Sequence, residues 1–172
     1  TKIFGEPVFV HPRNIARLMA PHRDATPTPA HQDFIYVQGS QSTYTCWFPL
    51  GDCPRQLGGL TVLAGTHSRD ILKVRDADGA GHRTVVLDDC PERWVEGDLQ
   101  AGDVLIFHSK TVHRSLPNLT EDRIRLSVDF RYQPLSVPVV DSTSLLPHVS
   151  LLTWEEVYEG WGGSDLKYYW KE

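Results

Sequence analysis

Short apolar runs separated by turn-forming residues make up most of the chain. The runs, rich in Val, Ile, Leu, Thr and aromatic residues, are 7–10, 15–19, 31–37, 43–50, 59–63, 84–87, 103–107 and 124–132. Glycine, proline and aspartate lie between them, and the last run alternates strongly between side chains of opposite character. Runs of this length with such boundaries are typical of β-strands. The pattern therefore predicts an all-β chain with minor helices, arranged as a sandwich or barrel.

Two segments depart from this pattern. Residues 70–82 are charged and glycine-rich, so we expect a solvated hairpin or surface loop there; the alternative is a mobile lid over a binding site. Thr153 and Glu156 have the spacing of a helix capping box. The apolar residues that follow share one helical face: Trp154, Val157, Tyr158 and Trp161. We expect a helix that packs on the barrel wall and ends at the glycines 160, 162 and 163.

The composition narrows the class of protein. With 172 residues, of which 40% are hydrophobic, residues 1–172 are expected to form one domain with a sizeable core. The net charge of −5 and the scattered Lys and Arg argue against a nucleic-acid partner. No apolar run approaches the ~18 residues that a membrane span needs. Cys46, Cys53 and Cys90 form no CxxC motif, which argues against a disulfide framework and favours a reducing, cytoplasmic location.

A small group of polar residues indicates a metal site. If 31–37 is a strand, His31 and Asp33 lie on the same face. His113, which follows the apolar run 103–107, is the candidate for a third ligand from a facing strand. Two imidazoles and one carboxylate leave three open positions on one face of an octahedron, an arrangement that suits non-haem Fe(II) oxygenases. A His-x-Asp pair by itself is better explained as a hydrogen-bonded surface pair.

A second group indicates a carboxylate anchor. Arg125 and Ser127 are two residues apart on the run 124–132, so they share a face of the predicted strand. A guanidinium binds a carboxylate through two parallel charge-assisted hydrogen bonds. Arg123, Asp129 and Arg131 have the same parity, so the alternative is a solvated, charged strand face. Arg123 is the second choice for the anchor.

Read in order, several blocks of the chain resemble one family. The blocks are His31-Gln-Asp33, the sequence Cys-Trp-Phe-Pro-Leu at 46–50, Gly-Gly-Leu-Thr-Val-Leu-Ala-Gly-Thr-His at 58–67, Gly-Asp-Val-Leu-Ile-Phe at 102–107, His113 followed by Asn118, and Arg125-Leu-Ser127 leading into Phe-Arg-Tyr at 130–132. Over about residues 5–135 the chain is similar to the phytanoyl-CoA dioxygenase family of Fe(II)/2-oxoglutarate-dependent oxygenases. Ordered blocks with compatible spacing are far more specific than the His-x-Asp pair alone.

The resemblance implies a fold, cofactors and site residues. The implied fold is a double-stranded β-helix, also called a jelly roll, of the cupin-like type. The resemblance implies Fe(II) held by His31, Asp33 and His113, with 2-oxoglutarate bound by Arg125 and dioxygen as the second cosubstrate. Four further cosubstrate contacts are implied: Ser127, Trp47, Thr45 and Ser115. Asp33 also implies oxygen chemistry, because halogenating relatives have a small residue in its place.

The expected activity is hydroxylation of a C–H bond in a small organic substrate, with succinate and CO2 as products. Family members usually carry a long helical segment before the His-x-Asp motif, whereas thirty residues precede His31, so the chain is expected to lack that segment. Two alternatives stay open: a cupin-like metal enzyme that does not use 2-oxoglutarate, and a non-catalytic β-sandwich module or fragment. The substrate and the oligomeric state are not predicted.

Overall fold

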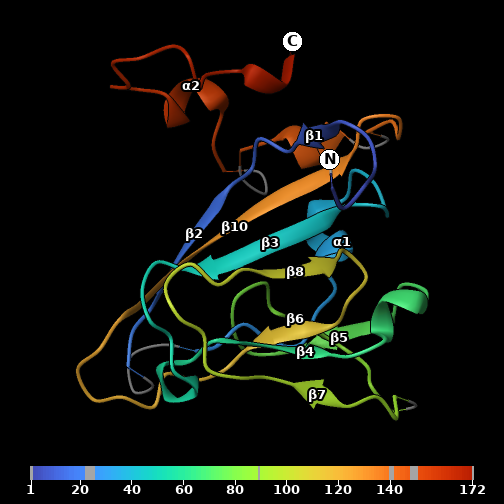
Figure 1. Ribbon diagram of the computed structural model, residues 1–172, viewed down its shortest axis with the longest axis vertical. Helices are drawn as coiled ribbons and strands as arrows, with labels where there is room; N and C mark the ends of the chain where they lie inside the picture. The colour runs from blue at the N-terminus through green and yellow to red at the C-terminus, as the bar shows by residue number, and fades with distance from the viewer. Residues whose placement is uncertain (1, 22–25, 89, 140–141, 148–150, 172) are drawn as a thin grey trace.

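The computed structural model describes residues 2–21, 26–88, 90–139, 142–147 and 151–171. Figure 1 shows strands stacked in two layers and joined by loops and short helices. The strands are β1 (Val8–Val10), β2 (Ile15–Met19), β3 (Tyr44–Pro49), β4 (Leu60–Leu63), β5 (Val74–Asp76), β6 (Arg83–Val85), β7 (Trp94–Val95), β8 (Leu105–His108), β9 (His113–Ser115) and β10 (Arg125–Pro134). The α-helices are α1 (Asp33–Val37) and α2 (Trp154–Val157), and single 3₁₀ turns occupy Arg55–Leu57, Thr66–Ser68, Ser142–Leu145 and Tyr169–Lys171. This β-rich content confirms the predicted class.

The larger sheet is built around β10, the longest strand. Along one edge β10 pairs antiparallel with β2 through its first half and with β1 through its last residues. Its other edge pairs with β3, which in turn pairs with β8. A single ten-residue strand therefore connects the N-terminal segment to the middle of the chain.

The second layer contains β4 between β7 and β9, together with the hairpin formed by β5 and β6. An apolar core joins the layers, because Trp47 and Phe107 of the larger sheet pack with Leu60 of β4 in one buried cluster. Two facing antiparallel sheets with a core between them are a sandwich or jelly roll. The fold is the double-stranded β-helix that the family resemblance implied.

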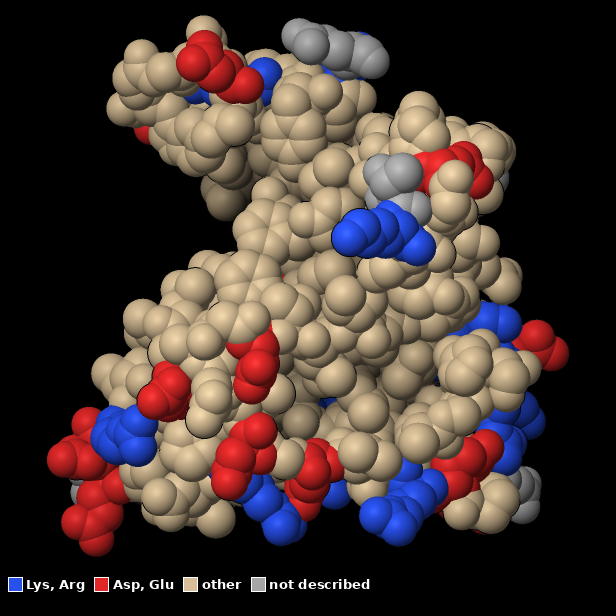
Figure 2. All heavy atoms as spheres, in the orientation of Figure 1, with Lys and Arg blue, Asp and Glu red and all other residues tan. Residues whose placement is uncertain are grey.

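Side-chain alternation in the larger sheet separates a polar interior from an apolar outer face. In β10 the residues at odd positions are buried: Arg125, Ser127, Asp129, Arg131 and Gln133. Large apolar side chains are exposed at other positions of this sheet: Leu18, Ile106 and Leu126. Figure 2 shows few charged side chains over the middle of the view, while acidic and basic ones are interspersed at the end that carries β7. A buried polar row of this kind needs partners inside the barrel.

One predicted strand was wrong. Residues 31–37 do not form a strand: His31 makes a single antiparallel bridge to His113, and α1 begins at Asp33. The β-branched and aromatic residues of this run suggested a strand, but strand propensity depends strongly on the surrounding packing. An acidic residue in the first turn favours a helix, since the carboxylate interacts with the positive end of the helix dipole.

The other segments agree with the prediction or shorten it. The predicted hairpin at 70–82 is the β5–β6 pair. The capping box is present, with the Thr153 hydroxyl accepting from the Glu156 amide, but α2 ends at Val157, so Trp161 lies beyond the helix and is 48% exposed. Trp154 packs against Tyr158 and other aromatic residues of the C-terminal segment. Within the described part of the chain, no helix has the length and apolar character that crossing a membrane requires.

Candidate active site

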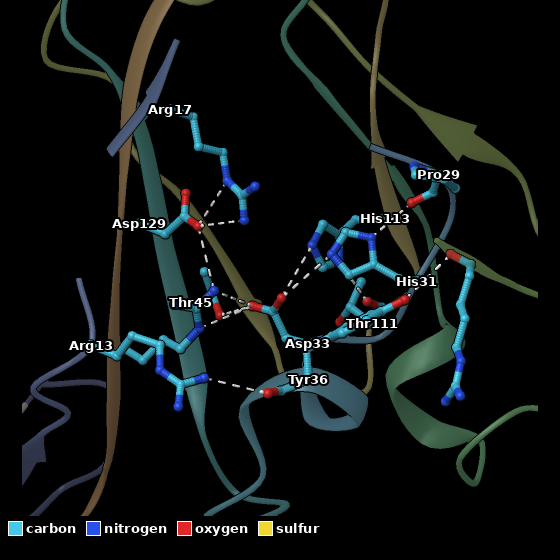
Figure 3. A network of polar contacts seen from close by, with 12 residues as sticks. Arg13, Arg17, Pro29, His31, Asp33, Tyr36, Thr45, Thr111, His113 and Asp129 are labelled. Carbon is cyan, nitrogen blue, oxygen red and sulfur yellow. Dashed lines mark hydrogen bonds and ion pairs between the residues drawn. The ribbon is translucent and has the colours of Figure 1, made fainter. Parts of the chain in front are cut away.

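The bridge between His31 and His113 brings two distant stretches of chain together. Each backbone amide donates to the other residue's carbonyl, at 2.9 and 3.0 Å. In such a directly opposed antiparallel pair both side chains leave the same face. The two imidazole rings lie 4.1 Å apart between centroids. The turn into α1 then places Asp33 beside both rings (Figure 3).

The three side chains could hold one metal ion. One ligand atom from each of His31, Asp33 and His113 lies within 4.8 Å of the others, and all three residues are buried. Asp33 Oδ1 is 3.6 Å from the Nε2 atoms of both histidines. Their Nδ1 atoms lie 2.8 and 3.0 Å from the carbonyls of Pro29 and Thr111. Because a carbonyl only accepts, each Nδ1 carries the proton, and the Nε2 lone pair faces the centre.

The electrostatics of the site favour the protonation states that a metal requires. Burial, with the neighbouring His31, lowers the pKa of His113 to about 3, so its imidazole is neutral near pH 7. Burial alone would raise the pKa of Asp33, but the guanidinium of Arg131 and the two histidines together outweigh this effect, and the pKa lies well below its usual range. Metal ligands bind as neutral imidazole and ionised carboxylate. The donor set therefore fits a divalent ion such as Fe(II).

A network of charged residues surrounds the second oxygen of Asp33. Oδ2 accepts a 2.5 Å hydrogen bond from the Thr45 hydroxyl and two of 3.3 Å from Nε and Nη2 of Arg131. Arg131 also contacts Asp129 at 3.4 Å, and Asp129 accepts from Arg17 at 3.2 Å. Figure 3 shows Arg17, Asp129 and Thr45 on one side of Asp33 and the two histidines on the other. Opposite charges therefore alternate from Arg17 to the metal-facing carboxylate.

The two candidate anchors differ in exposure. Arg123 is exposed, in the turn before β10, whereas Arg125 is 2% exposed at the start of the strand. The Arg125 Nη1 donates to the Ser127 hydroxyl at 2.6 Å, and its Cζ lies 5.6 Å from the centroid of the Trp47 ring. Its Nε and Nη2 have no hydrogen-bond partner among the described residues. Two orphaned donors on a buried guanidinium fit the carboxylate of a bound organic acid.

Two cavities meet at the metal-facing groups. A small one is lined by all three of His31, Asp33 and His113, and by the predicted cosubstrate contacts Thr45, Trp47 and Ser115. A larger one of about 450 Å³ is lined by His31 and Asp33 but extends away from Trp47. Six of the eight predicted site residues thus line the small cavity; Arg125 and Ser127 line neither cavity, and Arg125 approaches the site through its contact with the Trp47 ring.

Sequence reasoning missed the roles of Arg17, Asp129 and Arg131. The signal was present in the shared parity of Asp129 and Arg131 with Arg125, which is the buried face of β10. A solvated strand face explained that parity equally well until the facing layer was known. Arg17 gave no such signal, because it meets Asp129 only through the pairing of β2 with β10.

The chain is similar to proteins that are named for an activity, but the match covers only about half of their length. The 1-deoxypentalenic acid 11-beta-hydroxylase of Streptomyces arenae is 32% identical over 148 residues, which cover 78% of this chain and 52% of that protein. The chain therefore spans about half the length of this relative.

Solved structures share the fold. The non-heme alpha-ketoglutarate-dependent carbocyclase SnoK from nogalamycin biosynthesis is 28% identical, with a TM-score of 0.60 over 76% of this chain and 51% of that one. The epimerase SnoN, solved in complex with Fe3+, alpha-ketoglutarate and nogalamycin RO, is 26% identical, with a TM-score of 0.58 over the same shares. Residues 1–127 match the family described as Phytanoyl-CoA dioxygenase (PhyH). Since that match covers well over half of the sequence and includes the two histidines and the aspartate, the chain belongs to the phytanoyl-CoA dioxygenase family.

Proposed function

We propose that this chain is a catalytic domain of an Fe(II)/2-oxoglutarate-dependent oxygenase that hydroxylates a C–H bond of a small organic molecule. The observation that carries the proposal is the buried group of His31, Asp33 and His113, whose ligand atoms converge from two distant stretches. In the overall reaction, substrate, 2-oxoglutarate and O2 give the alcohol, succinate and CO2. When bound, the iron and 2-oxoglutarate supply the activation of dioxygen; the protein binds and orients the reactants.

In this proposal the three protein ligands occupy one side of the metal and leave three positions open. Two positions would take 2-oxoglutarate, and the third stays available for dioxygen. Arg125 would bind the far carboxylate of 2-oxoglutarate through its orphaned Nε and Nη2. Ser127 supports this role, because its hydroxyl accepts from the third guanidinium nitrogen and orients the other two.

The remaining predicted contacts have different support. Trp47 is 1% exposed and its Nε1 has no partner among the described residues, so it is available to donate to the cosubstrate. Ser115 lies on β9 two residues after His113 and is also buried. Thr45 lines the same small cavity, but its hydroxyl donates to Asp33. Trp47 and Ser115 therefore remain proposed cosubstrate contacts, whereas Thr45 is a hydrogen-bond partner of the proposed metal ligand Asp33.

The substrate is a small molecule in this proposal. The cavity of about 450 Å³ beside His31 and Asp33 has the size typical of small-ligand pockets. The similar proteins are named for reactions on small organic molecules, among them 1-deoxypentalenic acid. We also propose a cytoplasmic location, which the three free thiols Cys46, Cys53 and Cys90 support.

Binding of 2-oxoglutarate tests the cosubstrate assignment. Calorimetric titration of the Co2+-loaded protein should show binding, and Arg125→Gln should weaken it on the order of 100-fold, as loss of a buried charge-assisted pair costs about 3 kcal/mol. Arg123→Gln is the matched control, because Arg123 is exposed and should leave the affinity unchanged. Metal binding without any 2-oxoglutarate binding would favour the cupin-like alternative.

Turnover tests the reaction itself. With Fe(II) and a substrate, the protein should convert 2-oxoglutarate to succinate, and Asp33→Ala should abolish the conversion. Unchanged succinate formation in that variant would contradict the metal assignment. A folded protein that takes up no divalent metal would favour the non-catalytic alternative.

A further inference from the structure

The two oxygens of Asp33 have different surroundings. Oδ1 lies 3.6 Å from the Nε2 atoms of both His31 and His113. Oδ2 accepts the hydrogen bond from Thr45 and both hydrogen bonds from Arg131. In Figure 3 the contact from Thr45 reaches Asp33 on the side away from the imidazoles. Only one oxygen of this carboxylate is therefore directed at the metal-facing centre.

The two donors are held rigidly. Thr45 and Arg131 are directly opposed in the register of β3 and β10, and each is 1% exposed. Their side chains thus leave neighbouring points on the inner face of the same sheet. Arg131 is held further by Asp129, two residues earlier on the same strand. Asp33 reaches this pair from α1, on a different part of the fold.

This arrangement bears on how many metal positions stay open. A carboxylate can bind a metal through one oxygen or chelate it through both. If Asp33 chelated, the protein would fill four of six octahedral positions, and a bidentate cosubstrate would fill the last two. No position would then be left for dioxygen. Single-oxygen ligation keeps three positions open.

We propose that Arg131 and Thr45 are positioning residues that hold Asp33 to single-oxygen ligation and so keep the dioxygen position free. The inference rests on the metal centre of the proposed function. The charge of Arg131 keeps Asp33 ionised but also repels a divalent ion, so charge is not its whole effect on the site. Its two nitrogens directed at one oxygen restrain the orientation of that carboxylate.

The test counts the water molecules bound to the metal. Mn2+ is loaded into the protein and the relaxation of water protons is measured, because this signal scales with the number of exchanging waters on the ion. The parent protein should retain three waters, falling to one when 2-oxoglutarate binds. Thr45→Val and Arg131→Met, combined, should retain two waters, falling to none with 2-oxoglutarate.

Matched variants separate positioning from charge and from folding. Thr45→Ser keeps the hydroxyl and should behave as the parent. Arg131→Lys keeps the positive charge but not the two nitrogens directed at one oxygen, so its water number should fall as in Arg131→Met. Thermal unfolding shows whether each variant is folded. If Arg131→Met does not fold, Thr45→Val alone is the test, and its water number should lie below the parent value.

The outcomes are distinct. Parent-like water numbers and Mn2+ affinity in Thr45→Val, in Arg131→Met and in their combination would overturn the positioning role while leaving the metal centre intact. A parent protein that binds no Mn2+ would overturn the metal centre itself. A lower water number in Thr45→Val, together with a parent-like water number in Thr45→Ser, would establish the role.

Discussion

Gly58 marks a close approach between two parts of the chain that fixes the position of the His113 strand. It has φ +84°, and a Cβ added there would lie 2.8 Å from the carbonyl oxygen of Leu116 and 2.9 Å from the amide nitrogen of Asn118. Both neighbours are backbone atoms just after β9, so neither can swing aside as a side chain would. Gly58→Ala therefore forces this segment away from the start of β4.

The loss of stability expected for Gly58→Ala has two parts. An L-residue in the left-handed region costs about 1–2 kcal/mol. Displacing a packed backbone segment adds about 1–3 kcal/mol. Gly102→Ala is the matched control, because Gly102 also has positive φ, at +99°, but a Cβ there would meet nothing within 4 Å. The difference between the two variants isolates the close approach.

Thermal and urea unfolding measure this difference. For a chain of this size each 1 kcal/mol shifts Tm by roughly 2–4 °C. We expect Gly58→Ala to lower Tm by about 6–12 °C and Gly102→Ala by about 2–4 °C, given costs of about 3 and 1 kcal/mol. Equal losses in the two variants would refute the reasoning, because they would show that the contact with Leu116 and Asn118 contributes nothing beyond the backbone conformation.

Three further predictions concern buried polar groups. Asn118→Asp should destabilise the fold by about 2–4 kcal/mol in urea unfolding, because the Nδ2 group donates to the carbonyls of Met19 and Arg123, and a carboxylate would oppose both. Burial lowers the pKa of His11 from 6.5 to about 4, so as pH falls the unfolded chain takes up a proton before the folded protein does. The unfolding free energy should therefore fall by up to about 3 kcal/mol as pH drops from about 6.5 to about 4. Mn2+ at a hundred times its Kd should raise the unfolding free energy by about 2.7 kcal/mol, and His113→Ala should remove this gain.

Each of these has a specific control. Asn118→Gln retains the donors, and its loss should come from length alone. His11→Gln should flatten the pH profile between about 4 and 6.5 relative to the parent; an unchanged profile would contradict the assigned cause. Equal Mn2+ stabilisation of His113→Ala and the parent would mean that the ion binds elsewhere.

The strand content could be predicted because a half-buried strand imposes a period of two on its side chains. The expected run 124–132 overlaps β10 (Arg125–Pro134), and 43–50 contains β3 (Tyr44–Pro49). The strand predicted for 31–37 was wrong because the apolar and aromatic residues of this run fit a short helix as well as a strand. Periodicity over so few residues does not separate the two.

The choice between Arg123 and Arg125 shows a different limit. Both have the parity of the buried face, so alternation alone left both open. The strand begins at Arg125, and Asn118 holds the preceding turn by donating to the Arg123 carbonyl. That turn lies outside the barrel, which explains why Arg123 is exposed.

Local chemistry in the sequence determined the β-rich class, the sheet-forming segments, and the residue types able to bind a metal and an organic acid. These follow from side-chain properties and from spacing along a strand, which neighbouring residues set among themselves. Only the tertiary structure decided that Thr45 and Arg131 meet one oxygen of Asp33 and leave the other for the histidines. That arrangement depends on the register of β3 with β10 and on the path of α1, both of which arise from packing between residues far apart in the chain.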